Sequence, residues 1–155
     1  MLDDGLNLTT IELDEGEKIP NDLTKFDGMF CMGGPMDTYM EKEYPWLVEE
    51  KKRIKEFVIN LKKPYLGFCL GCQLLGEVVG GEVVKSNPAE IGIMDINFTN
   101  KKKEDSLFSK FPDNIKSLQW HSYEVQGIDK NPDITLLASS PVTKYQIFKY
   151  QHHAY

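Results

Sequence analysis

The hydrophobic positions along the chain fall into two patterns with different periods. Residues 28–32 and 65–68 are short, almost wholly apolar runs, which are typical of strands buried on both faces of a sheet. From Tyr44 to Leu61 the apolar residues instead recur on one side of a helix, with Pro45 at a suitable first position and Pro64 after its end. The pattern therefore predicts a strand, a surface helix and a second strand in that order.

The rest of the chain adds one helix and several strands. Residues 8–13 have the β-branched content and alternation of a strand, and residues 71–79 predict a helix closed by two glycines. Further strands are predicted at residues 82–85, 91–98, 115–120, 134–139 and 145–149. Apolar strands that alternate with helices predict an α/β protein with a parallel sheet between helices. We expect residues 1–155 to form one domain, long enough to bury a core.

Composition and charge exclude several kinds of function. The chain is 41% hydrophobic and has a net charge of −6 and a pI of about 5.1, whereas a nucleic-acid-binding domain normally presents a basic face. No apolar run approaches the ~18 residues that cross a bilayer. Residues 1–4 are acidic and lack the pattern of a secretory signal, so the three cysteines predict a reducing, cytoplasmic setting. We therefore expect a cytoplasmic protein that binds neither nucleic acid nor membrane.

The segment from Gly67 to Gln73 carries the candidate chemistry. Three interpretations are open: Cys69 is a nucleophile on a strand-to-helix turn, Cys69 and Cys72 are a redox pair, or both are small core residues. The C-x-x-C spacing after a strand is a legitimate redox signal, but it leaves Gly67 and Gln73 without an explanation. Two cysteines and three histidines lack the ligand spacing of a zinc site, so we expect no metal.

The two glycines around Cys69 favour the nucleophile. Gly67 and Gly71 are explained if Cys69 occupies a sharp, strained turn that other backbone must approach closely. The thiol would then lie at a helix N-terminus, where the helix dipole favours the thiolate and nearby N–H groups can hold a developing oxyanion. Cys31, inside an apolar run, and Cys72, in the first turn of a helix, are better explained as core residues.

Several motifs, in the order of the chain, resemble those of class I glutamine amidotransferases. Residues 67–75 resemble the nucleophile motif of this family, and residues 26–36, which include Gly33-Gly34-Pro35-Met36, resemble its oxyanion loop. The other motifs that recur there are at residues 44–47, 90–92, 119–121 and 136–140. Together they cover nearly the whole chain, and they are most similar to stand-alone members related to the amidotransferase half of GMP synthase.

This resemblance implies a fold and a reaction. The fold would be a three-layer α/β/α, flavodoxin-like domain with a mostly parallel sheet, incomplete at both ends. Cys69 would attack the side-chain amide carbon of glutamine, form a γ-glutamyl thioester and release ammonia. The N–H of Leu70 and one N–H of the loop at Gly33 and Gly34 would bind the oxyanion. The substrate glutamine would be held by Gln73, Ser122 and Tyr123.

The resemblance also implies that the general base lies outside this sequence. In the family, the catalytic His and Glu lie on a strand that would follow Tyr155. His121 resembles a structural histidine of the family, or is simply a hydrogen-bonded, partly buried one. His152 and His153 precede the strand on which the base should lie. We therefore expect the 155-residue chain not to hydrolyse glutamine at an enzymatic rate.

Other functions and partners stay open beside a glutamine-hydrolysing amidotransferase. A γ-glutamyl peptidase would share the turn and the thioester, and an amidotransferase-like domain without a working site would act only through partners. The ligand would be glutamine or another γ-glutamyl compound, with no cofactor. No P-loop occurs, so a synthetase that accepts the ammonia would lie on another chain or beyond the ends. Uncovered sheet edges would also favour association into a homo-oligomer.

Overall fold

The first part of the fold is a parallel pair of short strands. The computed structural model describes residues 5–155, so the acidic residues 1–4, from which the sequence predicts no secretory signal, lie outside the described chain. β1 (Met29–Cys31) pairs in parallel with β2 (Tyr65–Gly67), and Ala154 forms a further parallel bridge with Tyr65. These strands are the two apolar runs of the sequence.

Two helices cover one face of this strand pair. α1 (Trp46–Lys55) continues through one wider turn at Glu56–Asn60 and leads to β2, and α2 (Leu70–Val78) follows β2 directly. The other face of the strands carries Phe30, which is 47% exposed, and no described helix covers it. The core on the covered face combines side chains of both helices and both strands, among them Cys31, Leu47, Ile54, Tyr65 and Leu74.

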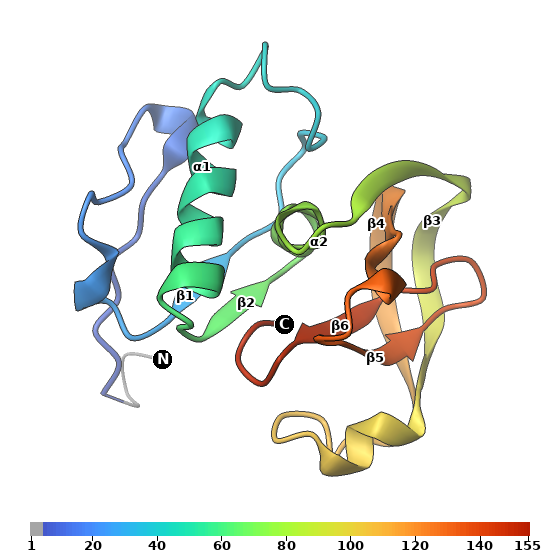
Figure 1. The fold of residues 1–155 in the computed structure, drawn as a ribbon. Coiled ribbons are helices and arrows are strands. Elements are labelled where there is room, and N and C mark those ends of the chain that lie inside the picture. The colour runs from blue at the N-terminus through green and yellow to red at the C-terminus, as the bar shows by residue number, and fades with distance from the viewer. Residues whose placement is uncertain (1–4) are drawn as a thin grey trace.

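The second half of the chain forms a curled antiparallel sheet. β3 (Glu82–Phe98) pairs with β4 (Asn114–Gln126), and β5 (Ile134–Ser139) and β6 (Ile147–Tyr150) complete the order β4-β3-β5-β6. Figure 1 shows this sheet on one side of the molecule, the pair β1–β2 with α1 on the other, and α2 between them. α2 therefore contributes to both halves of the fold.

The α/β class is confirmed, but the predicted sheet is wrong in its second half. Parallel pairing is limited, among residues 5–155, to β1, β2 and the bridge at Ala154. The strands from β3 to β6 are joined by connections with at most short 3₁₀ turns, which suit antiparallel neighbours and are too short for helical crossovers. The three-layer, flavodoxin-like arrangement is also absent from the described chain, because both helices lie on one face.

The strand predicted at residues 8–13 is also wrong. This segment contains no strand, and a 3₁₀ turn occupies Leu13–Glu15. Leu8 is 46% exposed, so the alternation does not bury one face of the segment. A strand needs a neighbour for its backbone N–H and C=O groups, and no described strand pairs with this segment.

Candidate active site

Cys69 occupies a strained backbone position between β2 and α2. Its φ of 51° and ψ of −105° lie outside the regions that residues with a side chain favour, which costs about 1–3 kcal/mol. Cys69 is the residue immediately before α2, and its side chain is exposed. The structure thus has a sharp strand-to-helix turn where the sequence predicts one.

Gly67 and Gly71 permit this turn because other backbone lies against them. A Cβ atom on Gly67 would lie 2.5 Å from the carbonyl carbon of Gly71, and one on Gly71 would lie 2.7 Å from the Cβ of Cys31. Neither distance is possible for a real side chain. The Tyr65 hydroxyl donates to the carbonyl oxygen of Gly71 at 2.8 Å, and the N–H of Phe68 donates to that of Cys31 at 2.8 Å. The turn is therefore fixed directly against β1.

The other two cysteines lie at the core. Cys31 is buried, and Cys72 packs against the same core cluster. Burial raises the pKa of Cys31 and that of Cys72 to about 12. Both thiols are therefore protonated at neutral pH, which agrees with the core role that the sequence predicts. All three cysteines are free in the structure, and Cys69 is the exposed one.

Cys69 opens into a cleft between the loop after β1 and the strands β3 and β4. The cleft has a volume of about 520 Å³. Its lining includes, besides Cys69, five residues that the sequence singles out: Gly34, Leu70, Gln73, Ser122 and Tyr123. Gly33 lies against the cysteine from the loop side, because a Cβ atom on Gly33 would lie 3.2 Å from the Cβ and 3.8 Å from the Sγ of Cys69. The fold thus brings all the predicted site residues around one thiol.

Backbone N–H groups beside the thiol are free to bind an anion. Those of Gly33, Gly34 and Leu70 donate no hydrogen bond to any described residue. Leu70 begins α2, and the first N–H groups of a helix have no partner within the helix. The helix dipole also favours negative charge at this end. The surroundings of Cys69 therefore suit a negatively charged oxygen.

Gln73 and His121 fix the backbone of β4 beside the cleft. The side-chain Nε2 of Gln73 donates to the carbonyl oxygen of Tyr123 at 3.1 Å. The Nδ1 of His121 lies 2.9 Å from the same oxygen. Because a carbonyl oxygen can only accept, this ring nitrogen carries the proton. Gln73 therefore connects α2 to the strand that carries Ser122 and Tyr123.

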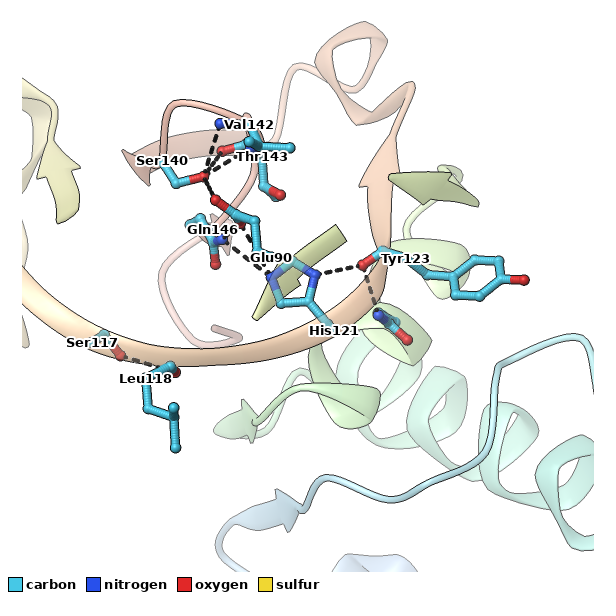
Figure 2. A network of polar contacts seen from close by, with 10 residues as sticks. Glu90, Ser117, Leu118, His121, Tyr123, Ser140, Val142, Thr143 and Gln146 are labelled. Carbon is cyan, nitrogen blue, oxygen red and sulfur yellow. Dashed lines mark hydrogen bonds and ion pairs between the residues drawn. The ribbon is translucent and has the colours of Figure 1, made fainter. Parts of the chain in front are cut away.

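A buried carboxylate holds the other side of the His121 ring. Glu90 on β3 is 1% exposed, and its Oε2 lies 3.3 Å from the Nε2 of His121, as Figure 2 shows. Ser140 Oγ donates to Glu90 at 2.5 Å, and Gln146 Nε2 donates to it as well. His121 is thus a hydrogen-bonded, partly buried histidine. The sequence does not reveal Glu90 as an anchor because its partners lie far apart along the chain, although it is the cross-strand neighbour of His121.

No histidine among residues 5–155 forms a hydrogen bond with the Cys69 thiol. The ring of His121 is engaged by Glu90 and Tyr123. The Nε2 of His153 donates to the carbonyl oxygen of Val58 at 3.0 Å, and its ring packs edge-on against that of His152. The imidazole rings among residues 5–155 therefore do not supply a base for the Cys69 thiol.

Metal-binding clusters and membrane-spanning helices are both absent from the described part of the chain. Residues 5–155 contain no group of three or more His, Cys, Asp or Glu side chains that could hold a metal ion. Within this range, no helix is long and apolar enough to cross a membrane.

Comparison with known proteins identifies the class. The profile of the family "Glutamine amidotransferase class-I" matches residues 2–154. A glutamine-hydrolysing GMP synthase subunit of Picrophilus torridus is 31% identical over 130 residues, which cover 84% of this chain and 63% of that protein. Gamma-glutamyl peptidase 3 of Arabidopsis thaliana is 30% identical over 139 residues, which cover 86% of this chain and 53% of that protein. A solved glutamine amidotransferase of Thermotoga maritima matches with a TM-score of 0.86 and 27% identity, over 99% of this chain and 64% of that one.

The matches fit the architecture of the cleft, where an exposed cysteine lies at a strained strand-to-helix turn with free N–H groups beside it. This chain belongs to the class I glutamine amidotransferase family. It spans 63% of the length of the Picrophilus protein and 53% of the length of the Arabidopsis peptidase.

Proposed function

We propose that the domain hydrolyses the side-chain amide of glutamine through a covalent intermediate on Cys69. The thiolate attacks the amide carbon, and a C–S bond forms while the carbonyl becomes an oxyanion. The C–N bond then breaks, and the nitrogen leaves as ammonia after gaining a proton. Water hydrolyses the γ-glutamyl thioester to glutamate and restores the thiol. The proposal depends above all on the exposed, strained Cys69 at the start of α2, facing the cleft.

In this proposal the oxyanion is held by backbone N–H groups on two sides. The N–H of Leu70 lies at the beginning of α2, next to the attacking residue, and the loop at Gly33 and Gly34 supplies the second donor. These groups have no partner among the described residues, so they need not break a hydrogen bond to bind the oxyanion. One such donor is commonly worth about 3–4 kcal/mol of transition-state stabilisation.

The amino-acid end of the substrate would be held at β4. Ser122 and Tyr123 line the cleft, and Gln73 fixes their backbone through the carbonyl of Tyr123. Contacts with the backbone at these positions depend on the geometry of the strand, and Glu90 and His121 stabilise that geometry from behind. We therefore assign Gln73, Ser122 and Tyr123 to substrate binding.

The complete reaction also needs an acid for the leaving nitrogen and a base for water. His121 and His153 already contact Tyr123 and Val58, so neither is free to serve Cys69. In the proposal, these groups come from a segment outside the present sequence. The present sequence spans 63% of the length of the Picrophilus protein. That relative is named as one subunit of a glutamine-hydrolysing GMP synthase, so we propose that the ammonia passes to a synthetase chain in the cytoplasm.

A γ-glutamyl peptidase is the second candidate. It is favoured by the 30% identity with the Arabidopsis peptidase. Both reactions share the attack by Cys69 and the thioester, and they differ in the group that leaves. Ammonia release from glutamine and amine release from a γ-glutamyl peptide therefore separate the two. The redox alternative is disfavoured because burial raises the pKa of Cys72 to about 12, so Cys72 does not form a thiolate readily.

A chloroketone analogue of glutamine, in which a CH₂Cl group replaces the amide nitrogen, tests the proposal. The Cys69 sulfur displaces chloride and forms a stable C–S bond, a step that needs no acid for a leaving amine. We expect the rate of labelling to saturate with probe concentration, glutamine to slow it, and Cys69→Ser to abolish it. Cys72→Ala is the control that should keep it. Labelling that is linear in probe concentration and indifferent to glutamine would instead favour a binding module without a working site.

A further inference from the structure

One cluster of hydrogen bonds ties the loop after β1 to both helices. The loop leaves β1, passes α2 and then reaches the beginning of α1, as Figure 1 shows. Thr38 lies on this loop and is 1% exposed, and its hydroxyl donates to Oε1 of Glu77 on α2 at 2.6 Å. Lys51 on α1 donates to the carbonyl oxygen of Thr38 at 2.8 Å and pairs with Oε2 of Glu77 at 2.7 Å. We call these three residues the loop clamp.

The loop clamp contains a charged lysine between two acids. Lys51 also pairs with Glu41 on the loop at 2.9 Å, and its side chain is 20% exposed. Partial burial lowers the pKa of Lys51, but its hydrogen bonds with Glu77 and Glu41 raise it more, so the net pKa lies above the ordinary 10.5. The lysine is therefore charged at neutral pH, and its hydrogen bonds to the two carboxylates are stronger than those between neutral groups.

The loop has no other polar link of this kind to the helices. Within the described chain, no backbone hydrogen bond joins residues 32–38 to α1 or α2. Gly33 lies against the cysteine that precedes α2 at one end of this segment, and Thr38 is held at the other end. Four residues separate the two, and one of them, Pro35, has a fixed φ, so the segment is short and stiff. A shift of Thr38 therefore moves the two glycines as well.

The loop clamp lies outside the cleft. Among the described residues that line the cleft, none belongs to the clamp. Glu77 follows Cys69 by eight residues along α2, which places it about 12 Å further along the helix axis. At that distance its side chain does not touch a substrate bound at Cys69. An effect of the clamp on the reaction must therefore pass through the loop.

We infer that the loop clamp of Thr38, Lys51 and Glu77 positions one of the two donors for the oxyanion. The three side chains hold the loop so that an N–H group of Gly33 or Gly34 faces the oxygen of the attacked carbonyl group. A donor of this kind is effective because its position is fixed before the reaction, and a misplacement of about 1 Å can cost a hundredfold in rate. This inference rests on the proposed function of Cys69, and it adds positioning residues that act from outside the cleft.

Two labelling reactions of Cys69 distinguish the position of the loop from the reactivity of the thiol. The first uses the chloroketone analogue of glutamine, whose ketone oxygen should lie where the oxyanion forms. Its limiting rate at saturation measures the chemical step, and its half-saturating concentration measures binding. The second uses iodoacetamide, a small reagent that alkylates the thiol without binding as a substrate does. Both are followed by peptide mass spectrometry, well below the Tm of each variant.

Thr38→Val removes the hydroxyl that donates to Glu77 and keeps nearly the same shape. We expect the limiting rate with the chloroketone to fall about tenfold, which is less than the loss of a whole donor, because the loop is displaced and not removed. The half-saturating concentration and the iodoacetamide rate should stay within about twofold of those of the unmodified chain. Thr38→Ser keeps the hydroxyl and should restore most of the limiting rate.

Lys51→Met tests the loop clamp from the side of α1. It leaves Glu77 and Glu41 without their shared cation, so the limiting rate should fall in the same way as in Thr38→Val. Lys52→Met is the matched control, because Lys52 is the next residue of α1, its side chain is 68% exposed, and its one ion pair, with Glu49, is long at 3.6 Å. This control should keep the limiting rate of the unmodified chain.

The outcomes separate this inference from the function on which it rests. If labelling saturates and glutamine protects Cys69, but Thr38→Val and Lys51→Met keep the limiting rate, the loop clamp does not position a donor and the proposed function stands. If the iodoacetamide rate falls as much as the limiting rate, the variants disturb the turn itself, and the inference is again wrong. If labelling of the unmodified chain neither saturates nor responds to glutamine, the proposed function fails and the inference fails with it.

Discussion

Replacing Glu90 by Ala should destabilise the domain through the network that holds β4 beside the cleft. Glu90 is 1% exposed, and it accepts hydrogen bonds from Ser140, after β5, and Gln146, before β6. Its Oε2 also lies 3.3 Å from the ring of His121 on β4. The alanine variant leaves Ser140 and Gln146 without this acceptor, and His121 without this neighbour, in a region that water does not reach easily. The cost is therefore one of unsatisfied polar groups, with a smaller contribution from the lost volume.

The magnitude follows from the two donors. A buried polar group left without its partner costs about 1–3 kcal/mol. Taking the lower end for each donor, because a hydroxyl can rotate towards another acceptor, gives about 2 kcal/mol for Glu90→Ala. That is a sizeable fraction of the 5–15 kcal/mol typical of a domain, and it lowers the Tm by roughly 4–8 °C at this size. Glu90→Gln keeps the volume but turns an NH₂ group towards one donor, so we expect about 1 kcal/mol.

Urea unfolding followed by circular dichroism measures these free energies. Glu104→Ala is the matched control, because Glu104 is an exposed acid outside the network and its loss should cost less than about 0.5 kcal/mol. Hydrogen exchange should also become faster at residues 121–123 in Glu90→Ala, since His121 loses one of its two anchors. If Glu90→Ala unfolds at the same urea concentration as Glu104→Ala, the network around Glu90 does not stabilise the fold.

Two further changes test other parts of the structure. Gly71→Ala should cost at least about 2 kcal/mol in thermal unfolding, because its Cβ would lie 2.7 Å from that of Cys31; a cost near zero would mean that the turn is looser than described. Asp105→Asn should cost about 2 kcal/mol at pH 7. Burial raises the pKa of Asp105, but hydrogen bonds from Lys149, Phe108 and Leu107 lower it more strongly, so the net pKa lies below the ordinary 3.8. A lowered pKa contributes stability above the unfolded pKa and loses it as the pH falls through the folded pKa, so the two proteins should converge in urea unfolding once the pH is below the folded pKa; an unchanged gap there contradicts the assignment.

The elements around Cys69 could be predicted because their signals are local. An apolar run, two glycines and an amphipathic segment are contiguous in the sequence, and they specify β2, the turn and α2 without reference to the rest of the chain. The strands of the second half could be located, but not their pairing. Residues 82–85 and 91–98 belong to one long strand, and the pairing of β3 with β4 depends on contacts between distant residues.

For the site, too, the sequence predicts the residues that lie in local motifs and misses those that depend on contacts between distant segments. Cys69, Gly34 and Gln73 belong to motifs that can be read in one place, and the fold brings them to one cleft. The anchoring role of Glu90 depends on a register that no local pattern shows. The same holds for Tyr39, whose hydroxyl lies 3.1 Å from that of Tyr123 across the fold. Contacts between residues far apart in the chain therefore became visible in the structure alone.

The reactivity of Cys69 is the sharpest test of whether the turn before α2 activates this thiol. The chain is treated with limiting iodoacetamide near neutral pH and the labelled cysteines are located by peptide mass spectrometry, beside an unstructured peptide of residues 65–75 as the reference for an ordinary exposed thiol. We expect Cys69 to react faster than the same cysteine in the peptide, because its exposed thiol lies at the N-terminus of α2 with free backbone N–H groups beside it, while the buried Cys31 and Cys72 stay unlabelled until the protein unfolds. Labelling of Cys31 or Cys72 first, or a Cys69 no faster than the peptide, would contradict the role of Cys69 as the nucleophile.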